Sequence, residues 1–346
     1  MNLEEFNYEL PPSLIAAFPR REREKSRLLV LRRRNGEMIH SVFSELGDFF
    51  DPGDLLVLND TKVFPARLRG RKTSGGIVEV LLLEPFAGSS RSLWIALVDA
   101  AKKPPVGTWL SFGTALKAEV IGDLGGGRFG LEFHHDGEFS AQLETLGEPP
   151  LPPYVRRQRG AQDLDRERYQ TVYAAQSGAI AAPTAGFHFT PELFAKLSAQ
   201  GIERTLLTLH VGPGTFQPVR ASAIENHRME GERYRLGAES AAKINRAKQA
   251  GHRVVAVGST STRTLEWIAL KKTEIAADEG IARLYIRPGD PFRVLDALIT
   301  NFHLPASTPL ILVAAFAGLD LVRRAYREAI EQEYRFYSYG DAMLIL

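Results

Sequence analysis

The sequence contains no cysteine among its 346 residues. Disulfide bonds, thiolate metal sites and iron–sulfur clusters are therefore excluded, and we expect a cytoplasmic protein. An excess of either charge is also missing, because 43 Lys and Arg residues are balanced by 41 Asp and Glu residues. The formal net charge of +2 neither requires nor excludes a polyanionic partner, so the local distribution of charge has to decide.

Targeting signals and membrane-spanning runs are not found either. The N-terminal stretch MNLEEFNYELPPSLIAAFPR is acidic before it is apolar, whereas a secretion signal begins with basic residues. The longest run without a charged side chain, residues 297–319, is interrupted by Asn301, His303 and Pro305. A buried strand, loop and helix fit this run better than a membrane span, and we expect no membrane partner.

The length fits two domains, and the pattern of apolar, glycine and proline residues changes twice along the chain. Between about 62 and 151, short β-prone runs such as GIVEVLLLE and SLWIALVD are separated by Gly, Pro and Ser, which indicates an all-β unit. After this unit, strands and amphipathic helices alternate, as in α/β proteins. We predict an α/β main domain with a mixed or barrel-like sheet, formed by residues 1–61 and 152–346, an inserted small β-barrel domain at 62–151, and a monomer.

Local signals predict the elements of the α/β part. Thr190 followed by Pro191 predicts a helix from about 191, and further helices are expected at 238–250, from 259 and at 310–333. Strands are expected at 204–211, 252–258, 282–286 and 297–302, and SRLLVL and DLLVLND are expected to join the same sheet. The glycines 125–127 are expected to form a hairpin turn and not a phosphate loop, because no helical pattern follows them.

Basic residues gather in three stretches although the net charge is small. The stretch 20–34 carries eight Lys or Arg residues against Glu22 and Glu24, and shorter clusters lie at 67–72 and 156–159. Each cluster alone fits a solvated face equally well, but three of them near the expected domain junctions favour contacts with nucleic-acid phosphates. The candidate contact residues are Arg20, Arg21, Arg23, Arg67, Arg69, Arg156 and Arg157.

Four of the eight histidines, His188, His210, His227 and His303, fall in loops or at strand ends of the α/β part, where such folds build ligand sites. None of the four forms a His-x-x-x-His or comparable pair, so a zinc site would need ligands from four separate segments. General acid–base chemistry is therefore favoured over metal binding. His188, which lies between two phenylalanines, also fits a purely structural role in a buried loop.

Several polar segments are open to a functional or a structural interpretation. The hydroxyl run 259–262, followed by Arg263 at an expected helix start, favours a carboxylate or phosphate site. Glycines after a strand permit a ligand to approach closely or simply form a tight turn. A carboxylate near a histidine forms a general base or lies in a solvated loop. The glycines in question are Gly212 and Gly214, which follow His210, and the carboxylate is that of Glu232, near His227. Asn59 and Asp60 fit either a turn or a face of the same cleft.

A series of long motifs runs along nearly the whole chain: SRLLVL, DLLVLNDTKVFPARL, YQTVYA, GAIAAPTAGFHFT, LHVGPGTFQPV, HRMEGE, AVGSTSTRTLE, LITNFHLPASTPLILVAAFAG and YRFYSYGDAMLIL. In this order they resemble the S-adenosylmethionine:tRNA ribosyltransferase-isomerase family of the queuosine pathway. The sequence departs from the usual family pattern at Phe187, Pro213, Glu230 and Ala306. Glu230 replaces a common histidine, and Ala306 replaces a common lysine.

The resemblance implies that the ribosyl part of S-adenosylmethionine is transferred to 7-aminomethyl-7-deazaguanine at the wobble position of a tRNA and isomerised, giving epoxyqueuosine with release of adenine and methionine. It implies no metal, nicotinamide or flavin, because S-adenosylmethionine is consumed as a substrate. Such chemistry requires a base for the C5′ proton and an acid for the departing adenine. The catalytic candidates are His188, His210, His227 and Glu232, and the substrate-binding candidates are Asn59, Asp60, Thr184, Gly186, Gly212, Gly214, Ser259, Thr260, Ser261, Arg263, Asn301 and His303.

Two alternatives stay open from the residues alone. A non-catalytic tRNA-binding protein would explain the basic clusters but would leave the loop histidines without a task. A metal-dependent nucleotide hydrolase would instead use the scattered histidines as ligands.

Overall fold

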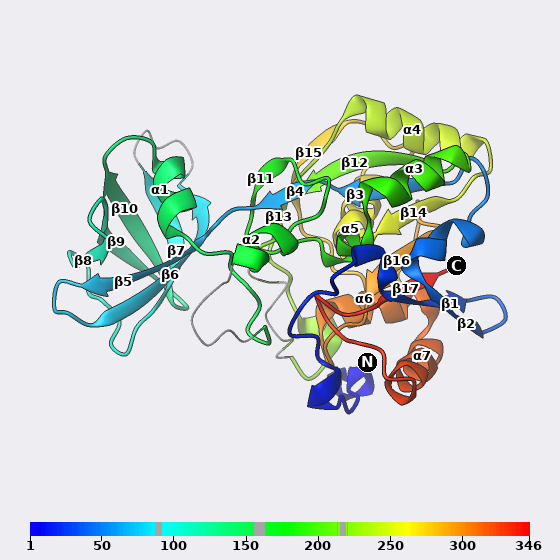
Figure 1. Cartoon of the computed structure of the whole chain (residues 1–346), viewed down its shortest axis with the longest axis horizontal. Coiled ribbons are helices and arrows are strands. Elements are labelled where there is room, and N and C mark those ends of the chain that lie inside the picture. The colour runs from blue at the N-terminus through cyan, green and yellow to red at the C-terminus, as the bar shows by residue number, and fades with distance from the viewer. Residues whose placement is uncertain (87–91, 156–162, 213, 215–218, 220) are drawn as a thin grey trace.

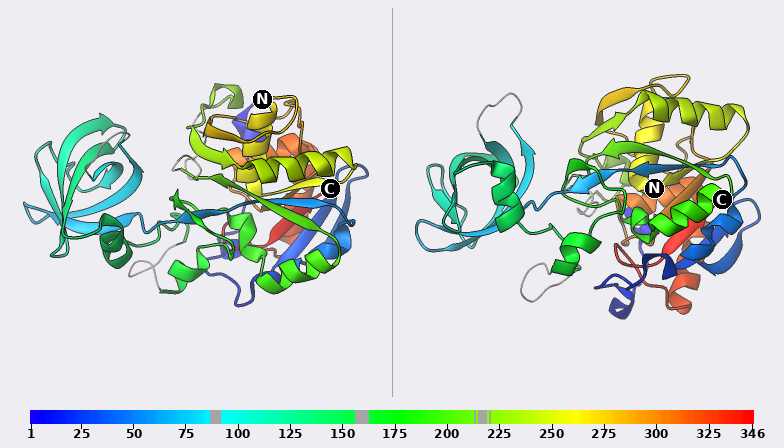
Figure 2. Two further views of the ribbon diagram at one scale, coloured as in Figure 1. Left: turned by 90° about the horizontal axis from the view of Figure 1, so that it is seen from above. Right: turned by 45° about the horizontal axis from the view of Figure 1, so that its top comes forward.

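The computed structural model describes residues 1–86, 92–155, 163–212, 214, 219 and 221–346. A large mixed β-sheet with helices on both faces forms one part, and a small closed β-barrel forms the other (Figure 1). The predicted fold class is confirmed. The barrel lies to one side of the sheet in each view (Figure 2). The position of the domain boundaries along the chain stays a prediction.

Within the described residues, nine strands form the large sheet, in the order β15-β13-β12-β3-β14-β16-β17-β1-β2. The neighbours β12, β3, β14 and β16 run parallel, whereas β17 runs antiparallel to β16 and parallel to β1. The strands are β1 (Arg27–Arg32), β2 (Glu37–Val42), β3 (Leu55–Asn59), β12 (Glu203–Leu209), β13 (Glu232–Leu236), β14 (Val254–Val257), β15 (Asp278–Ala282), β16 (Ala297–Asn301) and β17 (Ala342–Ile345).

Both faces of the sheet are buried, which explains why its central strands are continuous apolar runs. In β3, Leu55 and Val57 pack into the core on one face, and Leu56 and Leu58 pack into the core on the other. Residues of α4 to α7 complete the first core, whereas α3 and two 3-10 helices complete the second. These elements are α3 (Pro191–Ala199), α4 (Ala238–Gln249), α5 (Gly258–Ala269), α6 (Thr308–Ala317), α7 (Leu319–Glu331), η4 (Phe43–Phe49) and η5 (Thr184–His188).

The strand directions bring several loops to one edge of the sheet. The four parallel strands end at this edge, so the residues that follow β3, β12, β14 and β16 meet there. Because β17 and β1 run the opposite way to β16, the residues that precede them lie at the same edge. The basic N-terminal stretch before Arg27 is therefore placed beside the loops that carry the candidate site residues.

The barrel closes through the strand order β10-β7-β6-β5-β8-β9, with its own apolar interior. Its glycines 125–127 all have positive φ and connect β9 to β10, so the predicted hairpin turn is confirmed. A short parallel pair of strands, β4 and β11, lies between the barrel and the sheet (Figure 1). The elements are β4 (Thr61–Val63), β5 (Arg67–Lys72), β6 (Ile77–Pro85), β7 (Leu93–Asp99), β8 (Trp109–Phe112), β9 (Leu116–Gly125), β10 (Arg128–His135), α1 (Phe139–Leu146), α2 (Asp163–Arg168) and β11 (Gln176–Ala179).

Most of the predicted elements of the α/β part are confirmed, with three corrections. The predicted helix at 310–333 is two helices, because Gly318 adopts φ +91° between α6 and α7. The strand predicted at 282–286 is wrong, since β15 ends at Ala282. Helix α5 begins at Gly258, and no hydroxyl side chain caps it. The predicted cap of α3 is confirmed, because Thr190 accepts the N–H of Leu193.

Asp341 fastens the N-terminal stretch to the end of the chain. Its buried carboxylate accepts the backbone N–H groups of Arg27 at 2.9 Å and Arg335 at 2.8 Å, and the guanidinium of Arg20 at 3.1 Å. We expect Asp341→Ala to lower the free energy of unfolding by about 3 kcal/mol, because these donors lose their buried acceptor.

Urea denaturation of the two proteins measures this effect. Glu37→Ala serves as the control, because it breaks a half-exposed ion pair with Arg32 and should cost less than about 1 kcal/mol. An equal loss in both variants would contradict the assigned role of Asp341.

Candidate functional site

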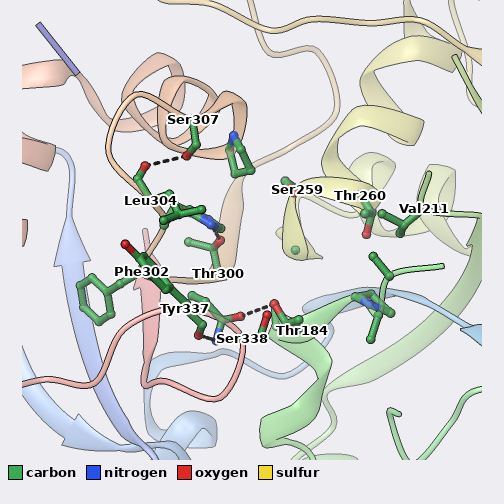
Figure 3. A pocket seen from close by; sticks show the side chains of 18 of the residues that line it. Thr184, Val211, Ser259, Thr260, Thr300, Phe302, Leu304, Ser307, Tyr337 and Ser338 are labelled. Atoms are coloured by element: carbon green, nitrogen blue, oxygen red, sulfur yellow. Dashed lines mark hydrogen bonds between the residues drawn. The ribbon is translucent and has the colours of Figure 1, made fainter. Parts of the chain in front are cut away.

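A cavity lies at the edge of the sheet where β16 ends and where α5 and α6 begin (Figure 3). Its empty volume is about 730 Å³, a figure that includes the open solvent at its mouth. The walls come from η5, the start of α5, the loop between β16 and α6, and the turn that precedes β17. Four segments that are distant in the sequence therefore build one site.

Two helix starts face this cavity. Gly258, Ser259 and Thr260 open α5, and Ser307 caps α6. Because α5 has no side-chain cap, its first N–H groups are left for another acceptor. The hydroxyl oxygen of Thr260 is buried and, within the described residues, has no hydrogen-bond partner. This corner of the cavity therefore suits a carboxylate or another acceptor group.

His303 is the one histidine in the described lining of the cavity. The hydroxyl of Thr300 lies 2.6 Å from its Nε2, and the backbone N–H of His303 donates to the hydroxyl of Tyr326 at 2.9 Å. Burial lowers the pKa of His303 to about 4, so the ring is neutral at pH 7 and has one protonated and one unprotonated nitrogen. No Asp, Glu, Lys or Arg lines the cavity within the described residues, so His303 is the candidate for proton transfer there.

His188 lies behind the wall and not in it. Its Nδ1 donates to the hydroxyl of Ser26 at 2.8 Å, since that hydroxyl in turn donates to the carbonyl of Arg23. Its Nε2 is therefore the acceptor for the side-chain amide of Asn301 at 3.2 Å. Burial lowers the pKa of His188 to about 4, which keeps the ring neutral. His188 orients Asn301, and Asn301 lines the cavity.

Aromatic side chains close another part of the cavity. The rings of Tyr154 and Tyr337 lie 4.7 Å apart, and the hydroxyl of Tyr154 lies 2.5 Å from that of Ser338. Phe302 also lines the wall. Tyr337 has φ +71°, an unfavourable conformation for a bulky residue, and its N–H donates to the carbonyl of Phe302 at 3.0 Å. Such strain is typical of functional sites.

A second cleft opens between the sheet and the barrel, with an empty volume of about 1330 Å³ including its mouth. His210, Gly212 and Glu232 line it from the sheet, and Arg128 lines it from the barrel and forms an ion pair with Glu230. Val211 lines both this cleft and the first cavity, so the two spaces are neighbours. Burial and Arg233 lower the pKa of His210 below its ordinary value.

Arg263 does not reach the first cavity. Its guanidinium forms a buried ion pair with Glu232, and its Nε donates to the carbonyl of Leu284 at 3.0 Å. The other oxygen of Glu232 accepts the N–H of Gly212 at 2.9 Å. The pair therefore shapes the glycine turn of the second cleft, which corrects the expectation that Arg263 and the hydroxyl run act on one ligand group.

The remaining candidates have structural contacts. Asn59 and Asp60 hold the start of the connection to the barrel, because Asn59 bonds to the backbone of Leu209 and Asp60 accepts the hydroxyl of Thr208 at 2.6 Å. Burial raises the pKa of Asp60. Thr184 lines the first cavity, and its hydroxyl donates to the side-chain oxygen of Asn301 at 3.0 Å. Gly186 is buried against Tyr173, Ser261 is fully buried, and Gly214 lies near Glu230. His227 packs edge-on against Tyr285 and lies outside the described linings of both spaces.

The candidate tRNA contacts differ in how much of their charge is available. Arg20 is paired with Asp341, Arg67 and Arg69 are paired with Glu79, and Arg21 is exposed. Arg23 donates to the carbonyl of Phe187 at 3.1 Å. Arg156 and Arg157 lie outside the described residues.

Sequence reasoning missed several residues that close the first cavity, namely Tyr154, Thr300, Phe302, Ser307 and Ser338. Ser307 carried a readable signal, because a serine two residues before a proline is typical of a helix start. The strained backbone of Tyr337 has no such local signature.

An α/β sheet with an uncharged cavity at its strand ends and an inserted barrel defines the class: a small-molecule-binding α/β protein with an accessory β-domain. The chain belongs to the queuosine biosynthesis protein family, whose model matches residues 3–345. It is 51% identical over its full length to the S-adenosylmethionine:tRNA ribosyltransferase-isomerase of Anaeromyxobacter sp. (strain Fw109-5), covering 99% of that protein. It is 49% identical to the protein of the same name from Pelobacter propionicus, with both chains fully covered.

A solved structure supports the same assignment. The chain resembles the crystal structure of S-adenosylmethionine tRNA ribosyltransferase from Thermotoga maritima, with 38% identity and a TM-score of 0.55, over 99% of this chain and 100% of that one. Two further observations concern the described part of the chain. No helix there is long and apolar enough to cross a membrane, and no three His, Asp or Glu side chains come together as possible metal ligands.

The neutral, buried His188 predicts a pH-dependent stability. The pKa of His188 is about 4 in the folded protein against an ordinary value of 6.5, so the unfolded chain binds more protons between these values. The free energy of unfolding should therefore fall as the pH drops from 6.5 to 4, by up to about 1.4 kcal/mol per pH unit from His188. Urea denaturation at several pH values should show a shallower slope for His188→Gln, while His134→Gln, at an exposed position, should keep the slope of the wild type.

Proposed function

We propose that this protein transfers and isomerises the ribosyl moiety of S-adenosylmethionine onto 7-aminomethyl-7-deazaguanine at the wobble position of a tRNA. Epoxyqueuosine-tRNA, adenine and methionine are the products. Family membership and the shared name of the full-length relatives support this function, and they favour neither the non-catalytic tRNA-binding protein nor the metal-dependent hydrolase. The proposal includes a cytoplasmic monomer that needs no cofactor.

The observation that carries the proposal is the chemistry of the first cavity. S-adenosylmethionine has a carboxylate, a sulfonium and an uncharged nucleoside, and each finds a suitable surface there. The start of α5, which has no side-chain cap, provides N–H groups for the carboxylate. The rings of Tyr154 and Tyr337 can attract a cation, and no charged side chain in the described lining competes for it.

His303 takes the C5′ proton. The sulfonium acidifies the C5′ hydrogens, but a positioned base is still needed. A neutral imidazole at the cavity wall meets that need, whereas an imidazolium would repel the sulfonium. Loss of the proton leads to expulsion of adenine, attack of the aminomethyl nitrogen on the ribosyl unit, and closure of the epoxide as methionine departs.

The second cleft receives the tRNA base. It adjoins the first cavity at Val211, so an aminomethyl group entering from this side comes close to the ribosyl carbon. His210 and Glu232 line this entrance, where Glu232 is held by Arg263 and His210 lies 2.9 Å from the hydroxyl of Thr61. The barrel forms the opposite wall and helps to exclude water from the reactive intermediates.

The test of the overall function is incubation of the protein with S-adenosylmethionine and a tRNA that carries 7-aminomethyl-7-deazaguanine. Mass analysis of the nucleosides should show epoxyqueuosine, and chromatography should show one adenine released for each base modified. The same reaction after thorough chelation should proceed unchanged. Binding of the tRNA without release of adenine would overturn the proposal.

Replacement of the proposed base should slow the chemistry. We expect His303→Gln to lower kcat for adenine release at least about a hundredfold, because general-base catalysis is lost, and to change the KM for S-adenosylmethionine much less. His227→Gln is the matched control, since His227 lies outside the described linings of both spaces. Adenine release at the wild-type rate by folded His303→Gln protein would assign the proton transfer to another group.

Replacement at the start of α5 should affect binding. We expect Thr260→Val to raise the KM for S-adenosylmethionine about tenfold, because its unpartnered hydroxyl is proposed to bond to the ligand's carboxylate. Thr264→Val makes the same change one turn further along α5, where the hydroxyl donates to the carbonyl of Thr260 and does not line the cavity. Similar KM values for the two variants would refute this role of Thr260.

A further inference from the structure

Phe18 is an unusual surface residue. Its side chain is 49% exposed, and among the described residues it is the single aromatic among the exposed large apolar side chains. Isolated exposed aliphatic residues are common on soluble proteins, but an exposed aromatic ring in a basic stretch of chain is typical of surfaces that stack nucleic-acid bases.

The backbone around Phe18 is held firmly. Leu14 and Ala16 pair with Phe336 through hydrogen bonds of 2.8 and 3.2 Å. Arg335 donates to the carbonyl of Phe18 itself, and Arg20, two residues further on, is paired with Asp341. An exposed ring on a fixed backbone loses little conformational freedom when a ligand stacks on it, which favours binding.

Three guanidinium groups of this region bind backbone carbonyls: that of Arg335 bonds to Phe18, that of Arg168 to Arg20 and Arg21, and that of Arg23 to Phe187. Within the described residues, none of the three forms an ion pair. Burial and the neighbouring Arg168 lower the pKa of Arg23 to about 10, and burial together with Arg20 lowers that of Arg335. This crowding of like charges would be relieved by an anion such as a phosphate.

The same group of residues borders the proposed S-adenosylmethionine cavity. Arg20, Arg23 and Arg168 line a small hollow together with His188 and the turn 338–340. Ser338 of this turn also lines the first cavity. The hollow and the first cavity therefore share Ser338 as part of their walls.

We propose that Phe18 and the surrounding arginines form a docking site for a nucleotide next to the modified base of the tRNA. A base of the anticodon loop stacks on Phe18, and the adjoining phosphates bind Arg21, Arg23, Arg168 and Arg335. The inference rests on the proposed function for the identity of the RNA, and it adds a recognition site to it.

The first experiment measures the dissociation constant of the tRNA for the wild type, Phe18→Ala and Phe18→Trp. Loss of one base stack should weaken binding of Phe18→Ala by about tenfold, and tryptophan should restore it. The KM for S-adenosylmethionine and kcat at saturating tRNA should stay within about twofold of the wild type. Leu270→Ala is the control, because Leu270 is 50% exposed and terminates α5 at its far end from the cavity.

The second experiment varies the salt concentration. Arg21→Gln removes an exposed charge and should reduce the slope of log Kd against log salt by about one, whereas Phe18→Ala should leave the slope unchanged. Binding by Phe18→Ala within twofold of the wild type, or an equal loss in Leu270→Ala, would overturn the docking site.

The outcomes separate this inference from the proposed function. If the wild type releases adenine and Phe18→Ala binds tRNA normally, the docking site fails and the function stands. If the wild type binds tRNA through Phe18 but releases no adenine, the function fails and the docking site stands.

Discussion

The side-chain amide of Asn301 holds together the walls of the first cavity. Its oxygen accepts the hydroxyl of Thr184, and its nitrogen donates to the ring of His188 and to the carbonyl of Tyr337 at 3.3 Å. These partners belong to η5 and to the turn before β17, while Asn301 itself ends β16. A buried amide whose oxygen and nitrogen are both bonded fixes one arrangement of its neighbours, since another arrangement leaves a polar group unpaired. The position of the cavity thus depends on the end of one strand, and the strained backbone of Tyr337 is maintained by the same bond.

The strands and helices were largely predictable because their signals are local. Apolar runs gave β1, β3, β12, β14 and β16, and Thr190 with Pro191 gave the start of α3. The position of His303 at a strand end identified it in advance, and the family resemblance added Thr184 and Asn301, which also line the cavity. What could not be predicted depends on pairings between distant segments. The sequence has no local sign that Arg263 forms an ion pair with Glu232, 31 positions away. It also has no local sign that the ring of His188 bonds to Asn301 and not to a ligand.

The placement of charge follows from strand direction. A basic stretch at the N-terminus has no evident connection with a site built from residues between 154 and 338. Because β1 and β17 begin where β16 ends, the stretch before β1 and the turn before β17 lie at the edge that carries the cavity. Asp341 neutralises one of the arginines and fixes the backbone of others, so part of the local charge is structural. The arginines bound only to carbonyl oxygens keep their charge, and these are the groups that can attract a polyanion over a distance of about 8 Å in physiological salt.

The low pKa of His303 fits its proposed role, although a group that binds protons weakly in water would be a poor base there. Burial is what lowers this pKa, because a cation in the cavity loses its hydration. The proton that His303 takes comes from a sulfonium compound in the same cavity. The positive charge of that sulfonium has the same desolvation cost. The cavity holds one net positive charge before the proton transfer, on sulfur, and one net positive charge after it. The desolvation cost of that charge therefore applies to both states and largely cancels from the free-energy difference between them. A carboxylate at this position would instead form an ion pair with the sulfonium in the ground state, and binding that stabilises the ground state as much as the transition state does not accelerate the step. An uncharged lining with a neutral imidazole therefore suits proton abstraction from a cation.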